Sequence, residues 1–113
     1  MIVSLLEPDT GSILIDQYAM GSYSPYELRR NIGYVPQEGF YFSGSIETNI
    51  KMGCDTATDE DMTRAVRISG LDSVLKNTGC GLEMDVGENG DRLSGGQRQS
   101  MALARAIVRN PRV

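Results

Sequence analysis

The sequence predicts an α/β fold that is mainly helical, with short β-strands at its flank. The first half places runs of branched residues between turn residues, which is typical of strands. The second half has apolar residues at helical spacing and contains helix-start signals. With 113 residues, 40% of them hydrophobic, the chain is long enough for one domain or for part of one.

Two short strands are expected in the first half. Pro8–Gly11 has the composition of a turn, and the branched residues of Ser12–Asp16 follow it as the first strand. Tyr26–Asn31 is predicted as one or two helical turns, because Pro25 marks a helix start. Ile32–Pro36 is then expected as the second strand, closed by its proline.

Helices are predicted along the second half. Their expected ranges are Ser45–Met52, Glu60–Ser69, Leu71–Asn77 and Gly95–Arg109. Thr58 and Asp61 resemble a capping box ahead of the second of these helices, with Asp in place of the usual Glu or Gln. The three acids of Asp59–Asp61 suit the positive end of the helix dipole, so a metal site is not needed to explain them.

The last predicted helix has one apolar face. The residues on it are Met101, Ala104, Ile107 and Val108. Three arginines lie away from this face and are expected on the outside of the helix, solvated or paired: Arg105, Arg109 and Arg112. The aromatic run Phe40–Phe42 is expected to pack against the rest of the domain.

Composition excludes several classes of protein. The formal net charge of −4 gives no general attraction to nucleic acid, which is therefore not expected as a partner. The apolar stretches are too short to span a bilayer, and there is no secretion signal. Cys54 and Cys80 do not form a C-x-x-C pair and the chain has no histidine, so reduced thiols are expected rather than zinc ligands or a disulfide.

The stretch DRLSGGQRQS, residues 91–100, places two glycines where a helix begins. The first turn of a helix has free N–H groups and the positive end of the dipole, and glycines let an anion come close to them. Ser94 can cap the helix and offer a hydroxyl. The pattern favours a phosphate ligand, although Ser-Gly pairs before helices are often only caps.

This stretch resembles a known family. Leu93–Gln97 resembles the LSGGQ signature of the ATP-binding cassette (ABC) ATPases, and Ala102–Ala106 matches the usual continuation. Leu28–Gln37 is similar to the strand leading into the family's glutamine loop, the Q-loop. Phe42–Ile50 and Val86–Gly90 are similar to segments of ABC exporters.

The resemblance implies a site shared between two subunits. In this family two nucleotide-binding domains pair head to tail around ATP and Mg²⁺, and each signature helix faces the ATP bound to its partner. The residues expected to bind that ATP in trans are Ser94, Gly95, Gly96 and Gln97. Gln37 is expected to be catalytic, approaching Mg²⁺ indirectly together with the attacking water. The residues expected to couple to the transmembrane domain are Phe42, Glu88 and Gly90.

The sequence lacks the family's phosphate loop, G-x-x-x-x-G-K-[ST], and an apolar strand ending in Asp-Glu. We therefore expect an internal fragment of an ABC nucleotide-binding domain, inactive alone, which begins at the end of a helix at Met1–Leu6. Residues 1–37 would be partial core strands up to the Q-loop, residues 38–95 the helical subdomain and residues 95–113 the signature helix. Unpaired strands predict self-association of such a fragment.

Three function classes remain open at this point. The favoured one is the ATPase subunit of an exporter, at the cytoplasmic face of a membrane. The second is a soluble, non-transport ABC ATPase, which should lack the exporter-like loop at Val86–Gly90. The third is a stand-alone phosphate-binding adaptor module.

Overall fold

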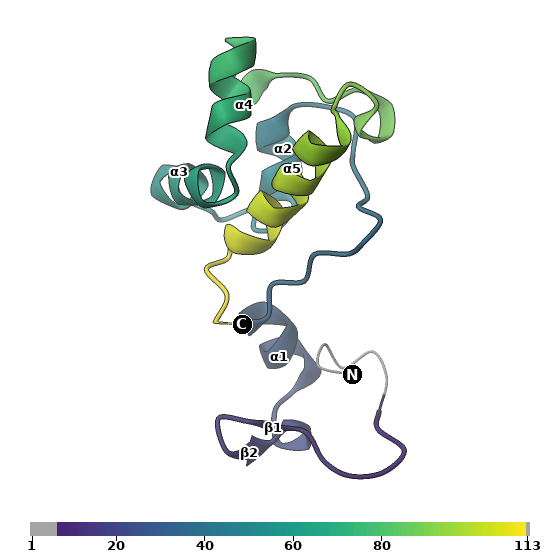
Figure 1. The fold of residues 1–113 in the computed structure, drawn as a ribbon. Helices are drawn as coiled ribbons and strands as arrows, with labels where there is room; N and C mark the ends of the chain where they lie inside the picture. The colour runs from purple at the N-terminus through teal and green to yellow at the C-terminus, as the bar shows by residue number, and fades with distance from the viewer. Residues whose placement is uncertain (1–6, 113) are drawn as a thin grey trace.

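The computed structural model describes residues 7–112, which form two parts joined by an extended segment (Figure 1). In chain order the elements, with η for 3₁₀ helices, are β1 (Leu14–Ile15), β2 (Tyr18–Ala19), η1 (Met20–Ser22), α1 (Pro25–Asn31), α2 (Ile46–Lys51), α3 (Asp59–Ile68), α4 (Leu71–Thr78), η2 (Gly81–Glu83), η3 (Glu88–Gly90) and α5 (Gly95–Ile107). The molecule is elongated, with extents of 50 × 27 × 20 Å. The predicted fold, mainly helical with short strands, is confirmed. The helix end expected at Met1–Leu6 lies outside the described residues.

The first predicted strand is shorter than expected and is half of a hairpin. β1 pairs antiparallel with β2, so that Leu14 lies opposite Ala19 and Ile15 opposite Tyr18. The connecting residues are Asp16 and Gln17, with φ of 50° and 71°. Two successive residues with positive φ are typical of a type I′ turn. This turn ends β1 at Ile15 and creates a second strand that the sequence analysis did not predict.

The second predicted strand, Ile32–Pro36, is wrong as a strand. Ile32 has extended backbone, with φ −110° and ψ 121°, but no residue of this range belongs to a sheet. Within residues 7–112 the hairpin is the only sheet. Branched residues and proline favour extended backbone, whereas a strand also needs a neighbour that takes its hydrogen bonds.

Side-chain caps set the starts of α1, α2, α3 and α5, whereas α4 begins after Gly70 without one. At α3, Thr58 Oγ1 accepts a hydrogen bond from Asp61 N (3.2 Å), and Asp61 Oδ2 accepts one from Thr58 N (3.1 Å). The predicted capping box is therefore confirmed. α5 ends at Ile107 rather than at Arg109, because Asn110 has a positive φ of 53° and precedes Pro111.

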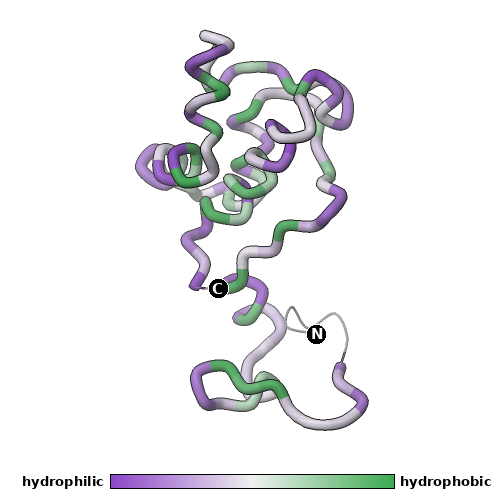
Figure 2. Tube along the Cα trace, in the orientation of Figure 1, coloured by the Kyte–Doolittle hydropathy of each residue, from purple (hydrophilic) through white to green (hydrophobic). Residues whose placement is uncertain are grey.

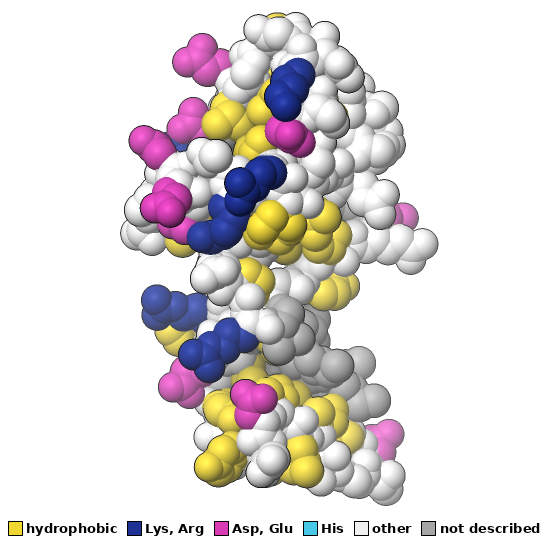
Figure 3. Space-filling model, turned by 60° about the vertical axis from the view of Figure 1, so that its left-hand side comes forward, with side chains coloured by type: hydrophobic (Ala, Val, Ile, Leu, Met, Phe, Trp, Pro, Cys, Tyr) yellow, Lys and Arg dark blue, Asp and Glu magenta, His cyan; other side chains and the backbone are white. Residues whose placement is uncertain are grey.

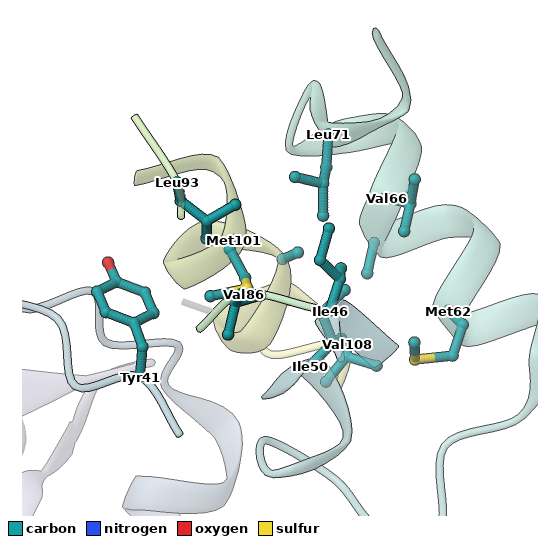
Figure 4. Close-up of a cluster of buried hydrophobic side chains, with 12 residues drawn as sticks. Tyr41, Ile46, Ile50, Met62, Val66, Leu71, Val86, Leu93, Met101 and Val108 are labelled. Carbon is teal, nitrogen blue, oxygen red and sulfur yellow. The ribbon is translucent and has the colours of Figure 1, made fainter. Parts of the chain in front are cut away.

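The hydrophobic core lies where α2, α3, α4 and α5 pack together (Figure 4). Its buried members are Tyr41, Ile46, Ile50, Met62, Ala65, Val66, Leu71, Val86, Leu93, Met101, Ala104 and Val108. On α5, Met101 and Ala104 are buried as predicted, and Ile107 packs partly buried against the same cluster. Full burial of a side chain such as Ile46 contributes about 1.5–3 kcal/mol. Val86 and Leu93 both belong to this core, so the segment 86–93, which precedes α5, is anchored at its two ends.

The surface mixes charge with exposed hydrophobic side chains. Figure 2 shows hydrophobic residues in the hairpin as well as among the packed helices. On the face drawn in Figure 3, hydrophobic patches lie between Lys and Arg side chains and Asp and Glu side chains. Among residues 7–112, every helix is too short or too polar to cross a bilayer.

Candidate functional site

Ser94 is the N-cap of α5, and its side chain is held by Gln97. Ser94 Oγ accepts a hydrogen bond from Gln97 N (3.2 Å), and Gln97 Oε1 accepts one from Ser94 N (2.9 Å). This reciprocal capping box fixes the first turn of α5 before any ligand arrives. Leu93, which precedes the cap, is buried and donates from its N to Gly90 O (3.0 Å). The helix start is thus anchored on one side and exposed on the other.

Gly95 and Gly96 occupy the exposed side of that turn. A Cβ atom placed on either glycine would meet nothing within 4 Å, and neither glycine has a positive φ. The fold of the described chain therefore needs no glycine at these two positions. In the interior of a helix a glycine costs about 1 kcal/mol relative to alanine, which is an upper bound for the first two residues of α5. Their absence of side chains leaves the N–H groups of the first turn open to a close approach from outside, which fits an anionic group.

The loop before the signature is closed by a side-chain clasp. Asp85 Oδ1 accepts a hydrogen bond from Gly87 N (2.9 Å), and Arg92 Nη1 pairs with Asp85 Oδ2 (2.9 Å). Val86 N donates to Gly44 O (2.9 Å), which attaches the loop to the residues before α2. Glu88 is exposed at the tip, so the clasp presents this carboxylate to the outside.

Gly90 lies at the base of the same loop, against Tyr41. Its φ is 70°, and a Cβ there would come within about 3.0 Å of the Tyr41 ring. Gly90 O accepts a hydrogen bond from Arg98 Nε (2.9 Å). Both its backbone and its lack of a side chain are therefore required by the fold. This contrasts with the open glycines Gly95 and Gly96 in Ser94–Gln97, the cap and first turn of α5, called the signature turn below.

Gln37 lies on the extended segment between α1 and α2, and it is exposed. Among residues 7–112, no hydrogen bond joins Gln37 to the signature turn of the same chain. Phe42 is 43% exposed, and its ring centroid lies 5.5 Å from that of Phe40. Of the aromatic run, Tyr41 alone is buried in the core.

Arg105 corrects the expectation that the arginines of α5 are solvated or paired on the outer face. It is half-buried, and its guanidinium donates to backbone and side-chain oxygens of residues 40–49. Burial lowers the pKa of Arg105, and the nearby Tyr41 opposes this shift. Arg109 and Arg112 are exposed, and Arg109 Nε donates to Gly53 O.

Asn49 is the residue of this region that the sequence analysis did not single out. It is fully buried between the core isoleucines of α2, and its side-chain amide is completely hydrogen-bonded. The sequence does contain a signal for it, because Asn49 is a polar residue on the apolar face of a short helix. A buried amide needs hydrogen-bond partners, so this position predicts a network around Asn49. Among the described residues, no cluster of three or more His, Cys, Asp or Glu side chains is arranged to hold a metal ion.

Comparison with known proteins decides the family. The ABC transporter family profile matches residues 1–113. The chain belongs to the ABC transporter family. The resemblance of Leu93–Gln97 to the ABC signature thus identified the family correctly.

Several similar ABC proteins bear the names of exporters. A putative export ATP-binding/permease protein of Rickettsia felis is 37% identical over 113 residues, which are 100% of this chain and 20% of that protein. The ABC transporter ATM1 of Toxoplasma gondii is 38% identical over the same length, 10% of its own. A solved structure of a bacterial Atm1-family ABC exporter with ATP bound matches with a TM-score of 0.85 and 33% identity, over 97% of this chain and 19% of that one. The chain therefore spans about a fifth or less of these relatives.

Proposed function

We propose that this chain is part of the ATP-binding and ATP-hydrolysing subunit of an ABC exporter. It supplies the Q-loop residue Gln37 and the signature turn, and the signature turn completes the ATP site of a second nucleotide-binding domain packed head to tail. The exporter relatives, including the Atm1-family structure with ATP bound, support this proposal. The complete protein would lie at the cytoplasmic face of a membrane, joined to a transmembrane domain.

The observation that carries the proposal is the pair of open glycines at Gly95 and Gly96. Within residues 7–112, no atom apart from the chain neighbours and the backbone of α5 itself lies within 4 Å of where their Cβ atoms would be, so packing does not explain the two glycines. A phosphate arriving from a second subunit is a sufficient reason, because it needs close access to the N–H groups of the first turn. Ser94, which is exposed at the same turn, adds a hydroxyl donor.

The turn acts as a fixed set of dipoles. When bound, ATP would supply the phosphoryl group that is transferred, and Mg²⁺ would supply positive charge that balances the phosphate oxygens. The capping box between Ser94 and Gln97 holds the turn in one conformation. Donors that are already oriented stabilise the charge that develops on the phosphoryl oxygens without reorganising during the reaction.

The remaining expected roles concern the subunit's own ATP and the membrane domain. Gln37 would orient water near Mg²⁺ in its own subunit, and its exposed position on the linking segment leaves it accessible. Phe42 and Glu88 are also exposed and could contact a transmembrane partner, whereas Gly90 would act from beneath the loop. Because the sequence has no phosphate loop, this chain alone is expected neither to bind ATP tightly nor to hydrolyse it.

The test is Gly96→Ala in the exporter polypeptide that carries this chain. Alanine fits the open space and favours the helix, so the melting temperature should stay the same or rise. ATP turnover should nevertheless fall by at least roughly tenfold, because the added methyl group keeps a phosphate from approaching the N–H groups of the first turn closely. Gln99→Ala, at an exposed position of the same helix, is the control and should leave turnover unchanged. Unchanged turnover in Gly96→Ala would refute the proposed role of the turn.

A further inference from the structure

We propose that Arg105 is a positioning residue that fixes the segment following Gln37 to α5, so that this segment and the signature turn move as one unit. The inference rests on the proposed function for the roles of Gln37 and Ser94. Gln37 lies three residues before Phe40, where the attachment begins. Arg105 itself would contact neither ATP nor the attacking water. It acts through the backbone of the segment to which it is hydrogen-bonded.

Three hydrogen bonds make the attachment. Arg105 Nη1 donates to Phe40 O (2.6 Å), Nε donates to Asn49 O (3.0 Å) and Nη2 donates to Asn49 Oδ1 (3.0 Å). The donor belongs to α5, and all three acceptors belong to residues 40–49. The rigid fork of the guanidinium suits several acceptors at fixed positions. The contacts therefore fix the orientation of the segment as well as its distance from the helix.

Asn49 carries the attachment further along the segment. Its Oδ1 also accepts a hydrogen bond from Phe42 N (2.9 Å), while its Nδ2 donates to Phe42 O (2.8 Å) and Ser45 O (3.1 Å). The backbone of Phe42 is thus bonded on both its N–H and its C=O to one buried side chain. Because Asn49 Oδ1 is shared with Arg105, the two residues form one network.

Tyr41 supplies a second attachment nearer the signature. Its hydroxyl donates to Arg98 O (2.9 Å), and its ring centroid lies 5.7 Å from Arg105 Cζ. Arg98 and Arg105 are two helical turns apart, about 10 Å along the axis at 1.5 Å per residue. Two attachments at this separation oppose both rotation and sliding of the segment against α5.

The charge of Arg105 is compensated entirely by neutral groups. Within the described part of the chain no carboxylate lies within 4 Å of its guanidinium. The carbonyl and amide oxygens of Phe40 and Asn49 therefore hold a half-buried cation. Lysine keeps the charge but cannot reproduce the fork, so Arg105→Lys tests the geometry separately from the charge.

The first arm of the test measures ATP turnover of the exporter polypeptide that carries this chain. Arg105→Lys should lower kcat by about tenfold, the factor expected for losing a charge-assisted hydrogen bond, with little change in KM for ATP. In a Gln37→Ala background the same substitution should have no further effect, because it acts through Gln37. Arg67→Lys, at an exposed position of α3, is the matched control. Equal losses of kcat in both backgrounds would overturn the inference.

The second arm measures amide hydrogen exchange in the same variants. In Arg105→Lys the Phe42 amide should exchange about tenfold faster, whereas the Val66 amide inside α3 should be unaffected. An unchanged Phe42 amide, or equal acceleration of Val66, would overturn the inference. If the unmodified exporter shows no ATP turnover, the proposed function fails, and this second arm still decides whether Arg105 holds the segment.

Discussion

At the residue scale, Ser94 combines two roles that substitution can separate. As N-cap it accepts a hydrogen bond from Gln97 N, and as part of the proposed site it offers its hydroxyl to a phosphate. Ser94→Ala should cost about 1 kcal/mol of unfolding free energy, and Ser94→Gly only roughly 0.3 kcal/mol. Both variants should lose ATP turnover to the same extent, because both lack the hydroxyl. Denaturant unfolding and turnover, measured on both variants, check this; turnover that follows stability instead would assign Ser94 a capping role alone.

Asp61 makes the stability of α3 dependent on pH. The backbone hydrogen bond from Thr58 is the main cause that holds the pKa of Asp61 below its ordinary value of 3.8. A carboxylate with a lowered pKa contributes stability above its unfolded pKa, and the contribution is lost as pH falls through the folded pKa. Asp61→Asn should therefore destabilise the protein at pH 7, and the difference in unfolding free energy should shrink as the pH falls below 3.8 and through the lowered folded pKa of Asp61. Urea unfolding of both proteins over a series of pH values from 7 downwards is the measurement, and a difference that stays constant would contradict the prediction.

The cap of α3 was predictable from the sequence, whereas the Arg105 contacts were not. A capping box joins residues three apart, so Thr58 and Asp61 reveal it directly. Arg105 lies 56 residues from Asn49 and 65 from Phe40, and helical spacing alone placed it outside the core stripe. Local patterns carry no information about which distant carbonyl oxygens a long side chain reaches.

At the scale of elements, the hairpin contains a turn residue that is unfavourable for its backbone. Gln17 has φ of 71°, a conformation that costs a non-glycine residue about 1–2 kcal/mol. Gln17→Gly should raise the unfolding free energy by about 0.5–1 kcal/mol, since glycine removes this strain but loses more entropy on folding. Gln17→Ala, which keeps the strain, is the control. Thermal unfolding of the three proteins checks this, and equal stability of the Gly and Ala variants would show that the turn is not strained.

The helices were easier to predict than the strands. Helices α2, α3 and α4 lie within one or two residues of their expected ranges, because caps and spacing are local signals. The residue types of Ile32–Pro36 correctly predicted extended backbone at Ile32. Whether such a segment pairs with another strand depends on residues far away in the sequence, which local patterns do not identify. The hairpin was missed because Asp16-Gln17 lacks the glycine that usually marks such a turn.

For the whole molecule, exposed apolar side chains accompany an unpaired extended segment. In Ile32–Pro36, which belongs to no sheet, the Tyr34 side chain is 62% exposed, and Leu14 on β1 is also 62% exposed. Unpaired extended backbone with apolar side chains favours association with another chain. Self-association of the 113-residue chain therefore stays a prediction. Light scattering should show an apparent mass that rises with concentration, and a constant monomer mass would contradict it.

The candidate site as a whole was predictable to the extent that it is contiguous. Ser94–Gln97 is one turn of one helix, so the sequence alone could single it out, and the family profile confirms the family to which the resemblance pointed. The attachment of Tyr41 and Asn49 to α5 joins segments more than fifty residues apart, which only the fold brings together. The part that involves a second subunit requires a direct functional test.

The most direct test of the shared site is a mixed dimer of two exporter polypeptides. One carries Gly96→Ala, and the other carries an alanine in place of the lysine of its phosphate loop, which lies outside this chain. If the signature acts in trans, the mixed dimer has one site with both halves intact and should hydrolyse ATP faster than either parent dimer. If it acts on the ATP of its own subunit, every site in the mixed dimer is damaged. A purified mixed dimer whose ATP turnover is no faster than that of the more active parent would contradict the account.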